Sequence, residues 1–327
     1  MKRQTTIFYL FLILVKSHLS SAAPPRIFDL VAKDKSIDHT PYDTTIGPYQ
    51  QCISICTLDP ECFSFAFEPR QQYGECSFYD ISYSFYTNQS RTLVTRPTGT
   101  KYYSIFPTDC ADLYAMGVHD SGVYTVKLLS KFKRDVYCVM DRYGGGWMAF
   151  QRRYDGSVEF PTRNWEEYKN GFGNSDGEYW LGNEMLHLLT TSQPHDYMVE
   201  GVSFQDEINY KKIRNVVING EDDYYRIVYD LASIDNTYTS TEYGTNMQGM
   251  KFTTKDKDND NNGLGNCAVR YGGWWLNDCH QEAMNGVFQQ EETTEDRNYN
   301  FGIMWKGWKN YEKSLKGSIL MIRPSSF

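Results

Sequence analysis

The densest group of candidate metal-binding and ligand-binding side chains lies at residues 255–280, in the run KDKDNDNNGLGNCAVRYGGWWLNDCH. Aspartates alternate with other residues at its start, so that several carboxylates can face one centre. Hard oxygen ligands of this kind suit Ca²⁺. A cysteine, a Gly-Gly-Trp-Trp turn and a Cys-His pair follow. The stretch therefore predicts a cation site, a short disulfide loop and an aromatic-lined pocket.

The register of the cation site depends on which of Asp256, Asp258 and Asp260 begins it. From Asp258 the run reproduces the D-x-D-x-N-G opening of an EF-hand loop. The closing glutamate expected at the twelfth position is Val269 instead, which excludes a helix–loop–helix calcium hand. Two interpretations remain: a looser oxygen site, and a solvated acidic loop flanked by lysines.

Composition and the N-terminus indicate a secreted protein. The 327 residues carry a net charge of -8, which argues against nucleic acid or an anionic membrane as the main partner. Lys2 and Arg3, an apolar run at 7–15 and small residues at 20–22 predict a signal peptide over residues 1–22. No other stretch approaches the length of a membrane span. We therefore expect a soluble, extracellular product.

Eight cysteines should pair in an oxidising compartment. They form two sets of four, separated by a turn-rich segment at residues 96–100, and this division predicts two disulfide-bonded domains. Zinc is disfavoured because neither set has CxxC spacing. The sets are Cys52, Cys56, Cys62 and Cys76, then Cys110, Cys138, Cys267 and Cys279.

The first set, spaced C-x3-C-x5-C and followed by SFAFEP and GEC, resembles the PAN/apple module. The resemblance covers about residues 29–103, within the domain that we place at residues 23–103. It implies the disulfides Cys52–Cys76 and Cys56–Cys62, and a module that binds proteins or carbohydrates. A disulfide-stabilised spacer is the alternative.

Asn88 begins an N-glycosylation sequon, and no heptad or Gly-X-Y run joins the domains.

The second half resembles the fibrinogen C-terminal, or fibrinogen-related, domain. The motifs that carry the resemblance are SGVYTV at 121–126, GGGWMAFQRRYDGSV at 144–158, WEEYKNGFG at 165–173 and GEYWLGNE at 177–184. They imply an α+β fold over residues 104–327, with a central antiparallel sheet, packed helices and a loop-rich calcium-binding region. Strands at 216–220 and 224–229 around an acidic turn, and a helix at 183–189, agree with this fold. The implied disulfides are Cys110–Cys138 and Cys267–Cys279.

The resemblance also implies a binding site. Its calcium ligands would be the Asp258 and Asp260 side chains with the Asn262 and Leu264 carbonyls, although one extra residue precedes Cys267. In the ficolin-like and horseshoe-crab-lectin branch, acetyl groups enter an aromatic funnel beside this loop. The matching positions are Tyr271, Cys279, His280, Tyr299 and Tyr311. The family also has a cis peptide at the position of Asp278–Cys279. Trp274, Trp275 and Trp305 are expected in the core.

Catalysis is disfavoured, because HExxH and G-x-S-x-G motifs are absent. Glu184 and His187 match half of a di-iron motif, but structural use is the simpler interpretation. We therefore expect a calcium-dependent, lectin-like protein that binds N-acetylated glycans or other acetylated surface groups in innate defence. The alternative is a protein-binding ligand or matrix adhesion factor of the angiopoietin or tenascin type, without sugar binding. Extracellular proteins could also bind the PAN-like domain.

Overall fold

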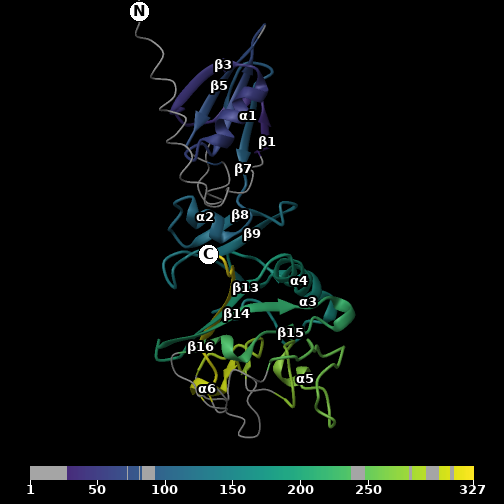
Figure 1. Cartoon of the computed structure of the whole chain (residues 1–327). Coiled ribbons are helices and arrows are strands. Elements are labelled where there is room, and N and C mark those ends of the chain that lie inside the picture. The colour runs from purple at the N-terminus through teal and green to yellow at the C-terminus, as the bar shows by residue number, and fades with distance from the viewer. Residues whose placement is uncertain are drawn as a thin grey trace, which may run out of the picture. The chain divides into compact units, whose positions relative to one another are not determined.

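The computed structural model describes residues 28–71, 73–80, 82, 93–236, 247–279, 282–291, 302–309 and 313–327 (Figure 1). These residues divide into two compact units, one ending at Ile105 and one running from Phe106 to Phe327. The division falls two residues after the boundary expected from the sequence. The expected signal peptide and Asn88 lie outside the described residues. No helix in the described ranges is long and apolar enough to cross a membrane.

Among the described residues, the first unit is built from strands and one helix, and the second adds five more helices and short 3₁₀ turns. The first unit contains β1 (Phe28–Lys33), β2 (Lys35–Ile37), β3 (Asp43–Gly47), α1 (Tyr49–Leu58), β4 (Ser64–Pro69), β5 (Gly74–Tyr79), β6 (Leu93–Thr95) and β7 (Lys101–Ile105). The second contains α2 (Cys110–Ala115), β8 (Gly122–Leu128), β9 (Phe132–Val139), β10 (Trp147–Arg153), α3 (Trp165–Asn170), β11 (Phe172–Gly173), β12 (Tyr179–Trp180), α4 (Asn183–Ser192), β13 (His195–Val202), β14 (Ile208–Ile218), η2 (Glu221–Asp223), β15 (Ile227–Val228), η3 (Leu231–Ser233), β16 (Ile234–Asn236), α5 (Ala268–Tyr271), β17 (Glu282–Ala283), β18 (Met304–Trp305), α6 (Lys306–Lys309) and β19 (Gly317–Pro324).

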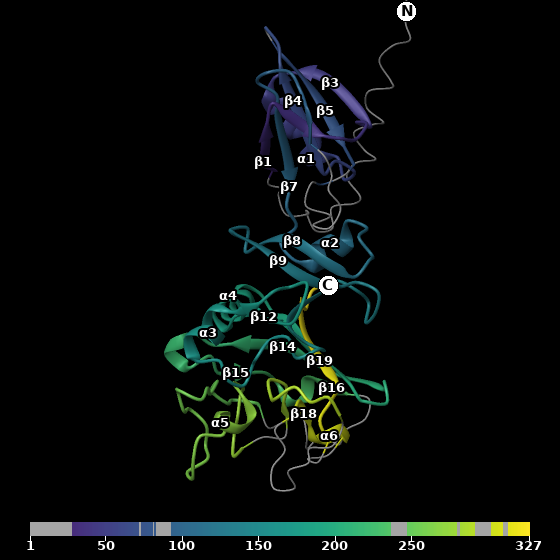
Figure 2. The same cartoon turned by 180° about the vertical axis from the view of Figure 1, so that it is seen from behind.

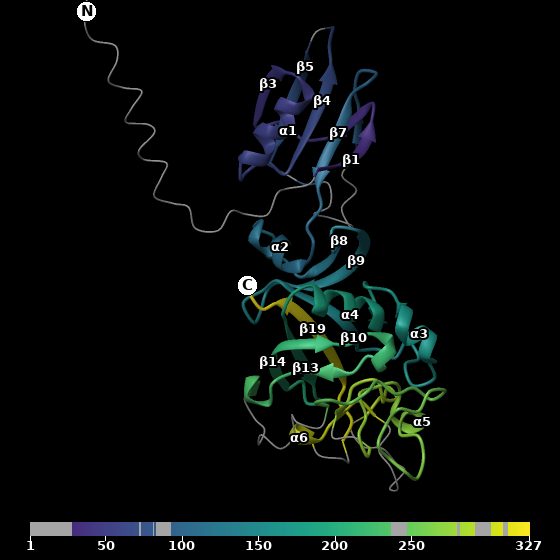
Figure 3. The same cartoon turned by 45° about the vertical axis from the view of Figure 1, so that its right-hand side comes forward.

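The first unit is an antiparallel sheet, in the order β1-β7-β4-β5-β3, with α1 packed on β4 and β5 (Figure 3). Two disulfides stabilise this packing. Cys52–Cys76 joins the helix to β5. Cys56–Cys62 links the last turns of the helix to the segment that follows it. The core beneath the helix is aromatic, with the Phe65 and Tyr103 rings stacked at 5.0 Å between centroids. A small unit gains much of its stability from such cross-links.

The second unit is organised around a sheet in the order β11-β12-β10-β19-β13-β14-β15 (Figure 2). Strand β9 also pairs with β10, and β8 with β9. The last strand, β19, lies between β10 and β13 and is antiparallel to both. The end of the chain therefore completes the centre of the sheet. The α+β fold with antiparallel strands is the one expected from the sequence.

Helices α3 and α4 lie beside the sheet, with α4 packed on β14 (Figure 3). Between β16 and β19 the described residues are mostly in loops, and these depend on aromatic packing for a core. Trp274, Trp275 and Trp305 are buried there, as expected. Phe252 packs edge-on to Trp275 at 5.1 Å. The loop region is thus held to the sheet by large apolar side chains.

The strands expected at 216–220 and 224–229 were predicted with the wrong lengths. Strand β14 begins eight residues earlier, at Ile208, while β15 is restricted to Ile227–Val228. Tyr224 and Tyr225 have φ angles of 54° and 50°, in the left-handed region. A strand cannot continue through two such residues, so the tyrosine-rich segment forms a turn instead.

Gly145 shows why the turn before β10 needs glycine. Its φ is 69°, and a Cβ atom there would lie 2.0 Å from the Tyr114 ring. No other residue fits both the conformation and the contact. The turn joins β9 to β10, and β10 pairs with both β9 and β19 in the sheet.

Candidate functional site

The loop that was predicted to carry the site is closed at both ends. Thr253 and Trp274 exchange backbone hydrogen bonds of 2.9 and 3.1 Å. Cys267–Cys279 bridges the loop at a Cα–Cα distance of 5.5 Å. This pair, like Cys110–Cys138 and the two in the first unit, matches the pairing that the family resemblance implies. The closures bring the acidic segment alongside residues 277–279.

Asp258 and Asp260 lie together on this loop. Asp258 Oδ1 accepts the Asp260 N–H at 3.3 Å. Asp260 accepts the N–H of Asn262 at 2.9 Å and that of Cys267 at 2.8 Å, one on each carboxylate oxygen. Partial burial raises the pKa of Asp260, and the adjacent Asp258 carboxylate adds to this, against the two N–H groups that lower it. A bound cation would favour the charged form of Asp260.

Asp256, the third candidate aspartate, is used elsewhere. Its carboxylate accepts the N–H of Trp165 at 3.0 and 3.2 Å, at the first position of α3. It also accepts the Thr254 hydroxyl at 2.8 Å. Asp256 thus satisfies a free donor at a helix start. This role leaves Asp258 and Asp260 as the aspartates of the run that do not contact the helix start.

Asn262 and Leu264 were expected to bind the cation through their main-chain carbonyl oxygens. The structure shows what surrounds their side chains. The Asn262 amide lies 3.3 Å from the Cys279 sulfur and its Oδ1 accepts the Leu264 N–H at 3.0 Å. The Leu264 side chain is 99% exposed, and Val269 on the same loop is 65% exposed. The loop therefore presents apolar side chains to solvent next to its carboxylates.

Of the expected pocket residues, the structure describes Tyr271 and Cys279. Tyr271 ends α5 and is buried, and Cys279 forms the disulfide. The Asp278–Cys279 peptide bond is cis, as expected. His280, Tyr299 and Tyr311 lie outside the described residues.

Glu184 and His187, which match half of a di-iron motif, have structural contacts. Glu184 accepts the Tyr225 hydroxyl at 2.8 Å. His187 Nδ1 lies 2.8 Å from the carbonyl oxygen of Ile218, which ends β14. Both side chains hold α4 to the neighbouring strand and turn. Among the described residues, no cluster of three or more His, Cys, Asp or Glu side chains could hold a metal.

The comparison with known families agrees with this geometry. Residues 106–325 match the family model of the C-terminal globular domain of fibrinogen beta and gamma chains. The chain belongs to the fibrinogen C-terminal domain family. Fibrinogen-like protein 1 of Bos taurus is 38% identical over 231 residues, which cover 67% of this chain and 72% of that protein.

Two further relatives show the breadth of this fibrinogen-related similarity. Angiopoietin-2 of Canis lupus familiaris is 36% identical over 228 residues, which cover 69% of this chain and 45% of that protein. The solved lamprey fibrin D-dimer, complexed with the peptide ligand Gly-His-Arg-Pro-amide, is 30% identical with a TM-score of 0.60. That match covers 67% of this chain and 73% of the lamprey chain.

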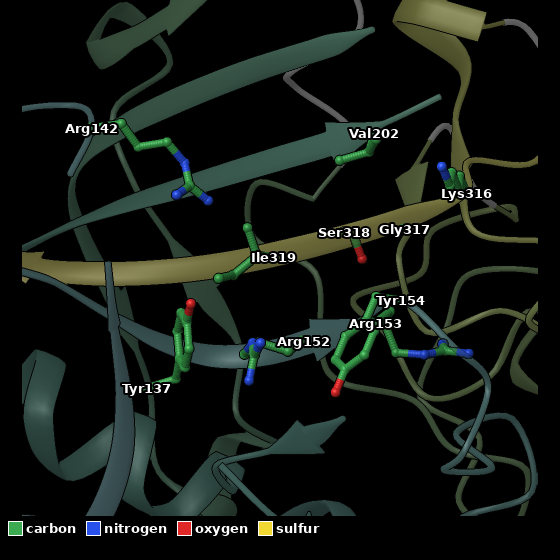
Figure 4. Close-up of a pocket in the computed structure, with 10 residues that line it drawn as sticks. All are labelled: Tyr137, Arg142, Arg152, Arg153, Tyr154, Val202, Lys316, Gly317, Ser318 and Ile319. Carbon is green, nitrogen blue, oxygen red and sulfur yellow. The ribbon is translucent and has the colours of Figure 1, made fainter. Parts of the chain in front are cut away.

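The fibrinogen-related domain also contains a basic cavity that the sequence analysis missed. It lies on the central sheet and includes Arg142, Arg152 and Lys316 in its lining (Figure 4). The Arg-Arg-Tyr run at 152–154 was noted only as part of a family motif. Two adjacent arginines in a predicted strand of an acidic protein could have pointed to an anion-binding site. The sequence does not show which of these arginines pairs with a carboxylate, because the carboxylates are distant in the chain.

Proposed function

We propose that this chain is an extracellular recognition protein that binds a protein or peptide partner through its fibrinogen-related domain. The observation that carries the proposal is the shared fold with lamprey fibrin, a relative solved with a peptide ligand. The similarity to fibrinogen-like protein 1 and angiopoietin-2 supports the same class. We favour this function over the lectin function expected from the sequence, which these comparisons do not support.

The loop of residues 253–279 is the surface that we assign to partner binding. It combines exposed Leu264 and Val269 with the Asp258–Asp260 carboxylates. Apolar groups that lose their water on contact can supply most of the affinity of a protein interface, and rim charges orient the partner. The disulfide and the Thr253–Trp274 bridge fix this loop before binding, which lowers the entropic cost of association.

Calcium is part of this proposal. Asp258 and Asp260 would hold the ion with carboxylate oxygens, and the Asn262 and Leu264 carbonyls would complete the set. The chemistry fits, because two adjacent carboxylates have no neutralising cation among the described residues. The ion would neutralise the pair and stiffen the loop.

Recognition of N-acetylated glycans or other acetylated surface groups, as in innate defence, is the second candidate. The supporting observation is that Tyr271 and Cys279 lie on the same loop of residues 253–279 as the acidic pair. His280, Tyr299 and Tyr311 would complete the funnel.

The first unit remains a proposed PAN/apple-like module. Its antiparallel sheet, single packed helix and two disulfides support that proposal. We propose that it contributes a second protein-binding surface.

The proposed function is tested by screening the full secreted protein against arrayed extracellular proteins and glycans, in calcium and in EDTA. We expect a protein partner whose binding falls at least fivefold in Leu264→Asp. Leu231→Asp is the matched control, because Leu231 is also exposed but lies in η3, outside the loop. Binding to acetylated glycans alone, lost in EDTA, would instead establish the lectin function.

A further inference from the structure

A cavity of about 240 Å³ opens on the central sheet where β10, β19 and the end of β13 meet (Figure 4). The strand register pairs Arg152 with Ile319, and Gly317 with Val202. Residues two apart in a strand face the same side, so Gly317 and Ile319 share the face of the sheet with the cavity. Gly317 contributes no side chain to that face. Gly317 therefore lines the hollow together with the apolar groups of Ile319 and Val202.

Cationic side chains line this hollow, and most of them are already paired. Arg142 donates Nε and Nη2 to the two Glu200 oxygens at 2.7 and 2.9 Å. Lys316 lies 2.5 Å from Asp206. Arg153, a buried side chain, lies 3.7 Å from Glu178. Within the described ranges, Arg152 is the lining cation that forms no ion pair with a carboxylate.

The Arg152 guanidinium is nevertheless held in place. Its Cζ lies 3.7 Å from the centre of the Tyr137 ring and 5.2 Å from that of Tyr154. Nη1 donates to the carbonyl oxygens of Ser175 at 2.9 Å and Gly177 at 3.2 Å. Aromatic faces stabilise a cation, and the two carbonyls fix its rotation.

One edge of this guanidinium remains available. Nε and Nη2 of Arg152 have no hydrogen-bond partner among the described residues, and neither is one of the buried unpartnered atoms. Both therefore reach solvent at the cavity. The Nε–Nη2 edge of arginine matches the two oxygens of a carboxylate.

We propose that this cavity binds the C-terminal carboxylate of a peptide or protein partner, with Arg152 as the anion-binding residue. The carboxylate accepts two hydrogen bonds from the Nε–Nη2 edge. The last side chain of the ligand, an aliphatic one, enters the hollow beside Gly317 and contacts Ile319 and Val202. This inference rests on the proposed protein-binding function and names one chemical group that the partner supplies.

A peptide fits these observations better than a sulfated polysaccharide. A polyanion binds through several unpaired cations, whereas three of the four lining cations have carboxylate partners. The chain also has a net charge of -8, which disfavours long polyanions. A single available guanidinium beside an apolar hollow suits one carboxylate and one aliphatic side chain.

The test uses the full protein and two probes, acetyl-Gly-Gly-Leu-Leu with a free C-terminal carboxylate and the same peptide as its amide. Saturation-transfer difference NMR measures the weak affinities expected for so small a ligand. We expect the acid to bind at least tenfold more tightly than the amide. Arg152→Gln should abolish this preference, and Arg152→Lys, which keeps the charge but loses the bidentate edge, should retain part of it. Lys309→Gln is the control, because Lys309 is ion-paired with Glu207 and does not line the cavity; this variant should bind within twofold of the wild type.

Equal binding of acid and amide, or an unchanged preference in a folded Arg152→Gln protein, would overturn the inference. So would binding of a heparin oligosaccharide at this site in place of the peptide. Folding of each variant is checked by its unfolding temperature, since Arg152 also contacts two carbonyls. If Arg152→Gln binds a protein partner identified on the array as tightly as the wild type, the proposed function stands and the carboxylate site fails. If the array yields no protein partner but the acid peptide binds through Arg152, the carboxylate site stands and the proposed function fails.

Discussion

At the scale of single residues, Asp256 and Asp258 take different roles although one residue separates them. Asp256 accepts the N–H of Trp165, so its charge stabilises the start of α3. Asp258 Oδ1 accepts the N–H of Asp260, and it contacts no helix start in the part of the chain that the structure describes. The alternation that suggests one metal site therefore contains two kinds of carboxylate.

This difference predicts the outcome of a calcium titration. Asp258→Ala and Asp260→Ala should abolish the heat of calcium binding, because each removes a carboxylate from a two-carboxylate site. Asp256→Ala should retain the heat and lower the free energy of unfolding by about 1 kcal/mol, the usual cost of a lost helix cap. Isothermal calorimetry and urea unfolding measure the two quantities. If wild-type protein releases no heat, or if Asp256→Ala alone abolishes it, the proposed ligand set is wrong.

Asp109 predicts a pH dependence of stability. Burial, with the nearby Asp112 charge, raises the pKa of this N-cap residue of α2 to about 7. Because the folded pKa lies above the unfolded value, the folded protein binds the extra proton between these pKa values. The resulting stability is complete below about pH 4 and is lost as the pH rises through 7.

Asp109→Asn should flatten this dependence. Asparagine keeps the oxygen that accepts the Asp112 N–H at 2.9 Å and removes the titration. Between pH 5.5 and pH 8 we expect the wild type to lose about 2 kcal/mol more stability than the variant. Urea unfolding at both pH values checks the difference. Parallel pH profiles for the two proteins would show that Asp109 does not titrate in this range.

At the scale of elements, α3 connects the sheet to the site loop through its first turn. Asn164 and Glu167 form a reciprocal capping box with two hydrogen bonds of 2.9 Å. The Trp165 ring then stacks on Tyr225 at 5.5 Å, and the Lys257 ammonium lies 3.8 Å from the Trp165 ring centre. The helix is short, so its caps and packing, rather than its length, stabilise it.

Asn164→Ala should therefore cost about 1 kcal/mol of unfolding free energy, while Asn164→Asp should stay within a few tenths of the wild type. Asn170→Ala is the matched control, since Asn170 lies in the same helix but bonds only the Glu166 carbonyl at an exposed position. Its effect should remain within about 0.5 kcal/mol. Chemical denaturation of the three variants measures these values. An equal loss in Asn164→Ala and Asn170→Ala would argue against the capping role.

At the scale of the whole molecule, the two units are chemically independent. All eight cysteines pair within their own unit, and each unit buries its own core. The family match covers only the second unit. Domains with separate cores commonly fold separately.

A protein that begins at residue 104 should consequently fold on its own. Its unfolding temperature should lie within a few degrees of that of the same unit in the full protein. It should also retain partner binding, because the site loop and the Arg152 cavity both lie in this unit. Differential scanning calorimetry and the binding assay test both statements. Loss of the transition would mean that the second unit depends on the first for folding. Loss of binding alone would place part of the interface in the first unit.

Local sequence determined much of this protein. Cysteine spacing indicated two units, and glycine and aromatic motifs indicated the α+β fibrinogen-related fold. The three buried tryptophans of the loop region were also expected, because large apolar side chains beside turn residues have few places to pack. These features depend on residue type and short spacing, which a sequence displays directly.

Other features were decided only by the tertiary structure. The use of Asp256 depends on Trp165, 91 residues away, and the pairing of Arg142 depends on Glu200, 58 residues away. Arg152 differs from the other lining cations because Glu200, Glu178 and Asp206, which pair with those cations, come from other parts of the chain. A charge is available for binding only if no distant partner neutralises it. That condition depends on strand order and register, which short-range patterns do not specify.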